Sequence, residues 1–520
     1  MIHIGSAMTF KDIDIKQSIL NSKKYLILYL IFVAVFVISN FNLVNYAFPR
    51  VEILVVSCVA ILGSFAIIFY CNNNEKEDLW KSAFIIVLIF GIMCSMLMPF
   101  FCAPDEYEHF VRSEITSTGQ LVPQFENNSY QTIQAYADIQ NHLGFQRDNH
   151  WNIIGVTHGT VFTSQAMDTP INYSSYSVNN SFAQNPFYGY LAQGLGMDIA
   201  KLLNLNLVWL LWLGRICNLI MYAAFAAIAV KKTPILKVPF IVMACIPLAV
   251  YQASSLSIDA FINGLSLVVI AYFFYMYKSP KRSLTRRHIV IFSRLCLLLA
   301  ISKISLFLFC LLWVIVPKDN FKEDKYYYYA LLSIPVVIGL VFAWTESIAK
   351  MSFHNSNRHQ YWVESNVSST GQISYLLNHK REGLVGIFHI ISYINHDLLH
   401  NANRLYFNPL NSVYLMFLGA VSLLYPIKKY DLKSRIWTFL IIMGTYFGTY
   451  IMFLLAWTPV GSLSIHGVQP RYFLPLFALL PFTFGFNHME GDKKEIDNMI
   501  ILLTISFLAL MIIALVGFYY

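Results

Sequence analysis

Charged residues are scarce in this 520-residue chain, where Asp, Glu, Lys and Arg make up 12% of the sequence. A soluble protein of this length carries about twice that fraction. The eight cysteines include no CxxC pair, and most lie in apolar runs, so neither a disulfide framework nor a cysteine metal or redox site is expected. The Walker phosphate loop, HExxH and the dinucleotide fingerprint are missing too, as is GxSxG in a suitable setting. These absences argue against nucleotide-using enzymes and the common hydrolases.

Apolar residues are abundant instead, at 57% of the chain. They form repeated runs long enough to cross ~30 Å of hydrocarbon as helices. The pattern predicts an all-α polytopic membrane protein, a bundle of about 13 transmembrane helices. The predicted spans are 25–45, 51–71, 82–101, 206–229, 238–253, 259–277, 288–302, 304–317, 327–346, 409–427, 436–457, 471–486 and 498–518.

The basic residues fix the predicted orientation. With the N-terminus in the cytoplasm, the segments KSPKRSLTRR (278–287) and KKYDLKSR (428–435) lie on the cytoplasmic side, and 23 of the 36 Lys and Arg residues fall in short cytoplasmic segments. This is the bias that the positive-inside rule describes. The net charge of +8 is therefore explained by topology, and nucleic acid is not expected as a partner. We predict a multi-pass protein of the cell inner (cytoplasmic) membrane.

This topology divides the chain into five regions. Two long, polar and aromatic segments face outward and alternate with the membrane helices; they are expected to contain helices that lie along the membrane surface, at 185–203 and 383–399. The regions are 1–101 (N-terminal transmembrane helices), 102–205 (first extracytoplasmic loop), 206–346 (transmembrane core), 347–408 (second extracytoplasmic loop) and 409–520 (C-terminal transmembrane helices).

The first outer loop begins with an acidic motif, APDEYEHFVRSE (103–114). On a helix, Asp105, Glu108, His109 and Arg112 would share one face, whereas Glu106 would point elsewhere. Acids in a first helical turn are also favoured by the helix dipole alone. A carboxylate at the edge of the membrane can have a raised pKa, as a general base needs. The acidic and histidine side chains could hold a divalent cation, but their spacing matches no specific metal motif.

Several other charged residues lie where topology does not explain them. Arg215 and Arg294 fall inside predicted spans, where a charge costs at least ~2.5–3.5 kcal/mol and faces a cavity or a partner. Asp259, Lys303 and Arg471 lie at the outer ends of spans. Each alone is compatible with an interface residue. Together with the acidic motif they outline a charged rim suited to holding a phosphate while an acceptor is activated.

At this point the sequence resembles the GT-C superfamily of integral-membrane glycosyltransferases, and more narrowly a bacterial family of uncharacterised polytopic membrane proteins with a PDE-x-x-H motif. The similar stretches are APDEYEHFVRSEITSTGQL (103–121), QNPFYGYLAQGLG (184–196), LGRICNLIMY (213–222), IPLAVYQASSLSIDAFINGLSLVVIAY (246–272), SKISLFLFCLLWVIVP (302–317) and GVQPRYFLPLFALLP (467–481). The resemblance implies a GT-C-like bundle and inverting sugar transfer on the outer face.

The resemblance also implies roles for particular residues. Asp105 or Glu106 would be the catalytic base that deprotonates an acceptor hydroxyl, and basic residues would hold the lipid phosphate of a polyprenyl-phosphate sugar donor. The candidate residues for binding substrate or lipid phosphate are His109, Arg215, Asp259, Lys303, Gln469 and Arg471. The acceptor would be a cell-envelope glycan, teichoic acid, O-antigen or protein.

Two alternatives remain open at the level of sequence. Arg215 and Arg294 within spans would also suit a membrane transporter or a lipid flippase. An envelope polysaccharide polymerase or ligase would share the outer acidic motif and differ mainly in its lipid-linked donor. No cofactor is certain, and a divalent cation stays open.

Overall fold

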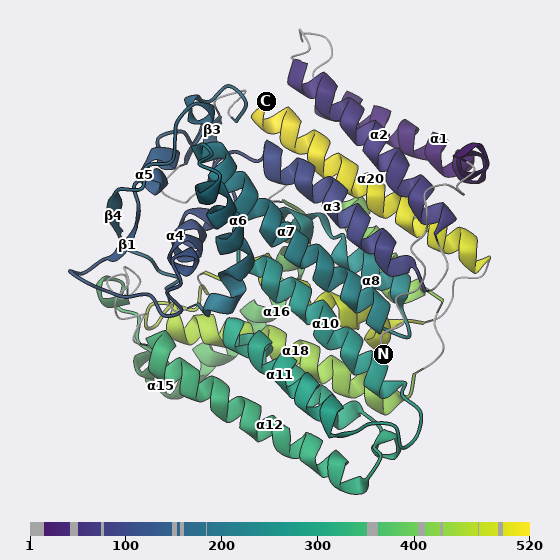
Figure 1. The fold of residues 1–520 in the computed structure, drawn as a ribbon. Coiled ribbons are helices and arrows are strands. Elements are labelled where there is room, and N and C mark those ends of the chain that lie inside the picture. Colours follow the sequence, from purple (N-terminus) through teal and green to yellow (C-terminus); the bar gives the residue numbers. More distant parts are fainter. Residues whose placement is uncertain are drawn as a thin grey trace.

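The computed structural model describes residues 15–41, 50–73, 77–147, 153–156, 161–183, 185–350, 362–403, 411–426, 430–465, 467–486 and 492–520. Most of these residues are helical (Figure 1). The α-helices are α1 (Ile15–Asn40), α2 (Arg50–Asn72), α3 (Leu79–Leu97), α4 (Glu106–Ser117), α5 (Ala135–Gln140), α6 (Leu191–Leu202), α7 (Leu207–Lys232), α8 (Lys237–Ala244), α9 (Pro247–Ala253), α10 (Asp259–Tyr277), α11 (Arg286–Ser302), α12 (Asp324–Trp344), α15 (Ser369–Asn378), α16 (Lys380–Asn403), α17 (Asn411–Leu424), α18 (Leu432–Ala456), α19 (Leu480–Phe484) and α20 (Lys493–Tyr519).

Shorter elements complete the described part of the chain. The 3₁₀-helices are η2 (Gln165–Met167), η3 (Phe187–Tyr190), η4 (Ile304–Ile315), η5 (Lys318–Asn320) and η7 (Pro470–Leu479), and η6 (Thr345–Ala349) is a π-helix. The strands are β1 (Tyr130–Ile133), β2 (Phe145–Arg147), β3 (Ile153–Val156) and β4 (Ser175–Val178). They form two antiparallel pairs, β1 with β4 and β2 with β3, in the first predicted outer loop. The predicted all-α fold did not include these strands.

Eight helices in the described residues are long and apolar enough to cross a membrane. They are α1, α2, α3, α7, α10, α12 with η6, α18 and α20. A polytopic membrane protein is thus confirmed, whereas the number of 13 spans is not. The other predicted spans are short, as in α11, η4 and α17, or interrupted, as in 238–253 and 471–486.

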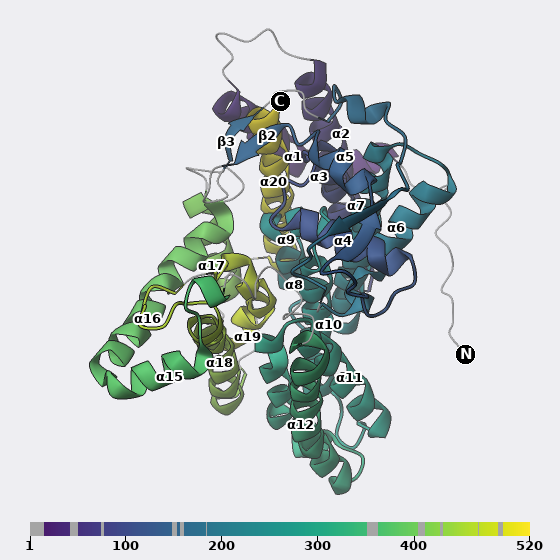
Figure 2. The ribbon, with the colours of Figure 1, turned by 90° about the vertical axis from the view of Figure 1, so that its left-hand side faces the viewer.

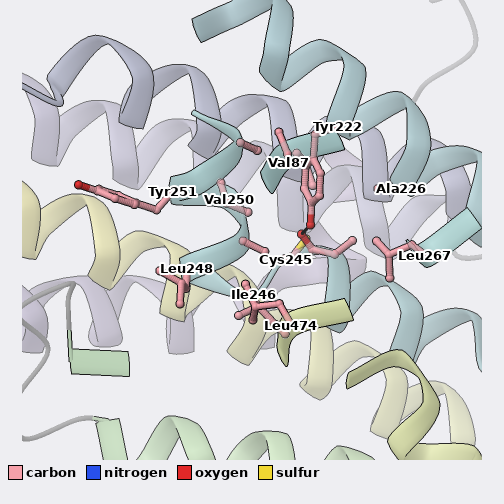
Figure 3. Packing of buried hydrophobic residues seen from close by; sticks show 14 of the residues in the cluster. Val87, Tyr222, Ala226, Cys245, Ile246, Leu248, Val250, Tyr251, Leu267 and Leu474 are labelled. Carbon is pink, nitrogen blue, oxygen red and sulfur yellow. Dashed lines mark hydrogen bonds between the residues drawn. The ribbon is translucent and has the colours of Figure 1, made fainter. Parts of the chain in front are cut away.

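Proline explains both interruptions. The segment 238–253 divides into α8 and α9 because Pro247 begins α9, where its missing N–H costs no hydrogen bond. The segment 471–486 divides into η7 and α19, with Pro475 inside η7 and Pro481 at the start of α19. Figure 3 shows how the first break is packed: Tyr222 of α7 points at it, and the Tyr222 hydroxyl donates to the Ala244 carbonyl at 2.7 Å. This bond satisfies one of the carbonyls that the end of α8 leaves open.

Helix α7 lies at the centre of the bundle and packs against α3, α6 and α10 (Figure 1). Helices α4, α5 and α6 and the strands gather at one end of these long helices (Figure 1), and this end faces the viewer in Figure 2. The predicted surface helix at 185–203 is found as η3 and α6, and that at 383–399 lies within α16. Their position relative to a membrane stays a prediction.

The contact between α6 and α7 depends on a glycine. A Cβ added at Gly196 would lie 2.1 Å from the Leu213 carbonyl oxygen, and a backbone atom of a central helix cannot move away at low cost. We expect Gly196→Ala to destabilise the protein by about 1–3 kcal/mol through overpacking. The measurement is the thermal unfolding midpoint of the purified protein in detergent. Gly448→Ala in α18 is the matched control, since a Cβ there meets nothing within 4 Å. Equal midpoints for the two variants would contradict this prediction.

Candidate functional site

Four charged side chains from distant parts of the sequence meet at one end of the bundle. Asp105 precedes α4, Asp259 begins α10, Lys303 follows α11, and Arg471 lies in η7. Arg471 Nη2 lies 2.7 Å from Asp105 Oδ2, and Arg471 Nε lies 3.0 Å from Asp259 Oδ2. Lys303 interacts electrostatically with both Asp259 and Arg471. We call these four residues the charged cluster.

Of the two carboxylates in the charged cluster, that of Asp105 is the more exposed. Its side chain is 32% exposed, against 11% for Asp259. Its backbone is left-handed, with φ of 59°, a conformation that costs energy for most residues but that Asp and Asn tolerate. The helix therefore starts at Glu106, while the Asp105 side chain leaves the helical path toward Arg471. The Asp105 carboxylate is therefore partly exposed.

Arg471 is the buried centre of the charged cluster, with 6% of its side chain exposed. Its Nη1 atom is buried and has no hydrogen-bond partner among the described residues. An unsatisfied buried donor is costly, more so when it is charged. An anion with several acceptor oxygens, such as a phosphate, would remove that cost, because guanidinium N–H groups match phosphate geometry.

Lys303 adds a second cation whose charge depends on its surroundings. Its ammonium lies 3.2 Å from the centroid of the Tyr472 ring, which follows Arg471 in the chain. Burial lowers the pKa of Lys303 to about 7, Asp259 opposes the shift, and the charge of Arg471 adds to it. Lys303 can therefore lose its proton near neutral pH unless an anion binds beside it. Tyr472 was not singled out from the sequence, and its position next to Arg471 was the available signal.

Glu106 occupies a different environment from its neighbour Asp105. It is fully buried and forms a two-point ion pair with Arg215 of α7, at 2.8 Å to Nε and 2.7 Å to Nη2. The Leu256 amide donates to the same carboxylate at 3.1 Å. Both oxygens of Glu106 are thus engaged and shielded from solvent. This geometry favours a structural role for Glu106 and leaves Asp105 as the more exposed of the two candidate bases.

Arg215 also closes the end of α3. Its Nη1 donates to the Ser95 and Met98 carbonyls at 3.1 and 2.8 Å, and its Nη2 donates to the Pro99 carbonyl at 2.9 Å. Carbonyls in the last turn of a helix need such donors. Arg215 therefore joins α3, α4 and α7, and these hydrogen bonds go to Glu106 and to backbone carbonyls rather than to the charged cluster. Its predicted role in holding a lipid phosphate gains no support from this placement.

His109 is linked to the charged cluster through Ser257. It is buried, its Nδ1 lies 2.8 Å from the Tyr190 hydroxyl, and its ring stacks on Phe182. Its Nε2 lies 3.3 Å from the Ser257 hydroxyl, whose oxygen also accepts the Asp259 amide at 3.1 Å. His109 therefore helps to fix the turn that presents Asp259. Ser257 lies in the stretch 246–272 that carries the family resemblance, but it was not among the candidate site residues.

Two further residues singled out from the sequence remain, Gln469 and Arg294. Gln469 caps η7 at the residue before Pro470 and is half-buried, close in sequence to Arg471. Arg294 is exposed on α11. Across the described ranges no group of three or more His, Cys, Asp or Glu residues is placed to hold a metal ion, so no ligand set is assigned to a divalent cation.

A bundle of apolar helices with a cluster of buried and half-exposed charges at one end defines a polytopic membrane protein. The model of one family, described as predicted membrane protein (DUF2142), matches residues 88–480. The chain belongs to that family. Comparison with curated proteins and with solved structures gives no match. The match includes the acidic motif, α7 and α10. It also covers all four residues of the charged cluster.

Proposed function

We propose that this protein is a glycosyltransferase that moves a sugar from a polyprenyl-phosphate-linked donor to a cell-envelope acceptor on the outer face of the inner membrane. The observation that carries the proposal is Arg471, a buried guanidinium with an unpaired nitrogen, held between a half-exposed and a buried carboxylate. This combination offers an anion-binding group and a base within one site. The acceptor class remains an envelope glycan, teichoic acid, O-antigen or protein.

In the proposed reaction Arg471 and Lys303 bind the donor phosphate. Asp105 takes the proton of the acceptor hydroxyl while that oxygen forms its bond to the anomeric carbon. The bond from this carbon to the phosphate oxygen breaks, and its electron pair remains on the departing polyprenyl phosphate. The two cations stabilise that charge as it develops. Attack opposite the leaving group inverts the anomeric configuration.

Binding of the donor would also prepare the base. Asp105 is paired with Arg471 at 2.7 Å, so part of its carboxylate is engaged by the guanidinium. A phosphate on Arg471 competes for the same N–H groups. The Asp105 carboxylate would then be released in part from Arg471 and could accept the proton of the acceptor hydroxyl. In this scheme Asp259 keeps its contact with Arg471 Nε and positions the guanidinium.

The transport alternative rested on two arginines within predicted spans. Arg215 is engaged by Glu106 and three backbone carbonyls, and Arg294 is exposed on α11. These placements give no support to a charged pathway through the membrane. A polymerase or ligase with a lipid-diphosphate donor shares the proposed chemistry, and the identity of the donor distinguishes it.

The proposal is tested with the purified protein and a panel of undecaprenyl-phosphate sugars and envelope acceptors. The expected result is transfer of one sugar with release of undecaprenyl phosphate, detected by mass spectrometry. Lipid-diphosphate oligosaccharides form the second arm of the panel. Turnover with the diphosphate donors alone would favour a polymerase or ligase over the proposed transferase. No turnover with either class of donor would refute both functions.

The low pKa of Lys303 predicts a pH-dependent donor affinity. Below about pH 7 the ammonium is charged and helps to bind phosphate, and its charge is lost as the pH rises. We expect the donor KM to increase between about pH 6 and 8.5, whereas the phosphodiester of the donor does not titrate there. Lys303→Arg should flatten this profile, because a guanidinium stays charged. Profiles of equal slope for the two proteins would contradict the assignment.

A further inference from the structure

A cavity of about 580 Å³ lies far from the charged cluster. Helix α10 begins at Asp259 in the charged cluster and ends at Tyr277, next to Lys278, which lines the cavity. At 1.5 Å per residue, the 19 residues of α10 separate the two sites by about 28 Å. The cavity therefore lies at the opposite end of the bundle, the side predicted to face the cytoplasm. Its walls come from α2, α3, α8 and α20 and from the ends of α10 and α17.

The cavity combines an apolar and aromatic floor with a basic rim. Tyr425, Leu236 and Val238 in its wall are buried. The rim carries four lysines, namely Lys237, Lys278, Lys493 and Lys494, against two acids, Asp492 and Asp497, which leaves a net charge of +2 (4 − 2).

Both acidic side chains in the cavity wall already accept hydrogen bonds from the protein. Asp492 caps α20 by accepting the Lys494 amide at 3.0 Å, and Asp497 accepts the Tyr425 hydroxyl at 2.9 Å. The carboxylates therefore order the wall of the cavity. The start of the long helix α20 adds its own partial positive charge at the same place.

Two of the lysines are placed over rings at the cavity edge. The Lys278 ammonium lies 5.0 Å from the Tyr430 ring centroid, and the Lys493 ammonium lies 5.7 Å from that of Tyr425. Basic residues at cytoplasmic helix ends are expected from topology alone. Topology does not explain why these lysines surround a cavity whose floor is formed by tyrosine and aliphatic side chains. Such a cavity has room for both the charged and the less polar part of one molecule.

We infer that this cavity is a second ligand site, which binds a phosphate-bearing molecule with its phosphate on the lysine rim and its less polar part on the tyrosine floor. The inference does not depend on the proposed transferase activity. The same chemistry has two sources, the headgroup of an anionic phospholipid or a free organic phosphate. At a membrane boundary, lysines attract anionic headgroups in the same way.

The test uses the full chain in nanodiscs of neutral lipid, titrated with phosphatidylglycerol, and in a separate arm with glycerol 3-phosphate. Binding is read by native mass spectrometry. We expect saturable binding, weakened on the order of 30-fold in the Lys278→Gln/Lys493→Gln variant. Lys278→Arg/Lys493→Arg keeps the charge and should keep the binding, which separates loss of charge from a folding defect.

Lys281→Gln/Lys322→Gln is the matched control, since both lysines lie on the same predicted side of the protein but do not line the cavity. The inference is overturned if this control loses as much binding as the cavity variant, or if the cavity variant binds like the wild type. Binding in the lipid arm alone identifies a headgroup, and competition by glycerol 3-phosphate identifies the phosphate as sufficient. Absence of lysine-dependent binding in both arms also rejects the site.

Discussion

Replacing Asp105 by Asn is expected to lower the rate of sugar transfer by about 10²–10⁴-fold, the range that a positioned general base contributes. Asparagine has nearly the same shape, and its carbonyl oxygen can still accept from Arg471, so the phosphate-binding geometry is expected to survive. The loss should therefore appear in kcat, with little change in the donor KM. The measurement is the initial rate at saturating donor, on protein with an unchanged unfolding midpoint.

Asp198→Asn is the control for this experiment. Asp198 lies on α6, outside the charged cluster; its side chain is 39% exposed and lies 4.0 Å from Lys201 Nζ. We expect it to leave transfer unchanged. Retention of wild-type kcat by Asp105→Asn would remove Asp105 from the reaction and with it the proposed base.

Breaking the Glu106–Arg215 ion pair is expected to have the largest effect on stability. Removing one partner leaves an uncompensated buried charge, at a cost of about 3–5 kcal/mol. Glu106→Gln and Arg215→Met should therefore both lower the thermal unfolding midpoint strongly. The double variant Glu106→Leu/Arg215→Met should recover part of the loss, but not all, because the carbonyls of α3 that Arg215 serves would still lack donors.

The same variants decide between the two candidate bases, Asp105 and Glu106. If Glu106→Gln folds with a normal midpoint and loses kcat, Glu106 is the base and Asp105 is not. If it is unstable while residual folded protein keeps its kcat, the structural role stands. Midpoints measured together with activity per folded molecule, from size-exclusion profiles, separate these outcomes.

Local features of the fold could be read from the sequence because they depend on neighbouring residues. Uninterrupted apolar runs predicted α2, α7 and α10 to within a few residues. The prediction of continuous spans at 238–253 and 471–486 gave too little weight to Pro247 and Pro475, which limit helix continuation. The strand pairs of the first outer loop escaped notice because each strand is only three or four residues long.

The partners within the site could not be read in the same way, because they are set by tertiary packing. The sequence placed Asp105, Asp259, Lys303 and Arg471 on one predicted side but could not pair them. Helical spacing predicted that Asp105 shares a face with His109. The left-handed backbone of Asp105 instead turns its side chain away from that face. The bond between Glu106 and Arg215 spans 109 residues, and no local pattern indicates it.

The bond between Asp105 and Arg471 joins residues 366 positions apart in the chain. A ribosome adding 5–20 residues per second needs roughly 20 to 70 s to make that stretch. During this interval the acidic motif can already be on its side of the membrane, but the arginine that completes the site does not yet exist. On the proposed function, the nascent chain would therefore be catalytically silent until the segment that carries Arg471 has been made. Two separately expressed pieces divided before Arg471 should likewise be inert alone and active only when they assemble.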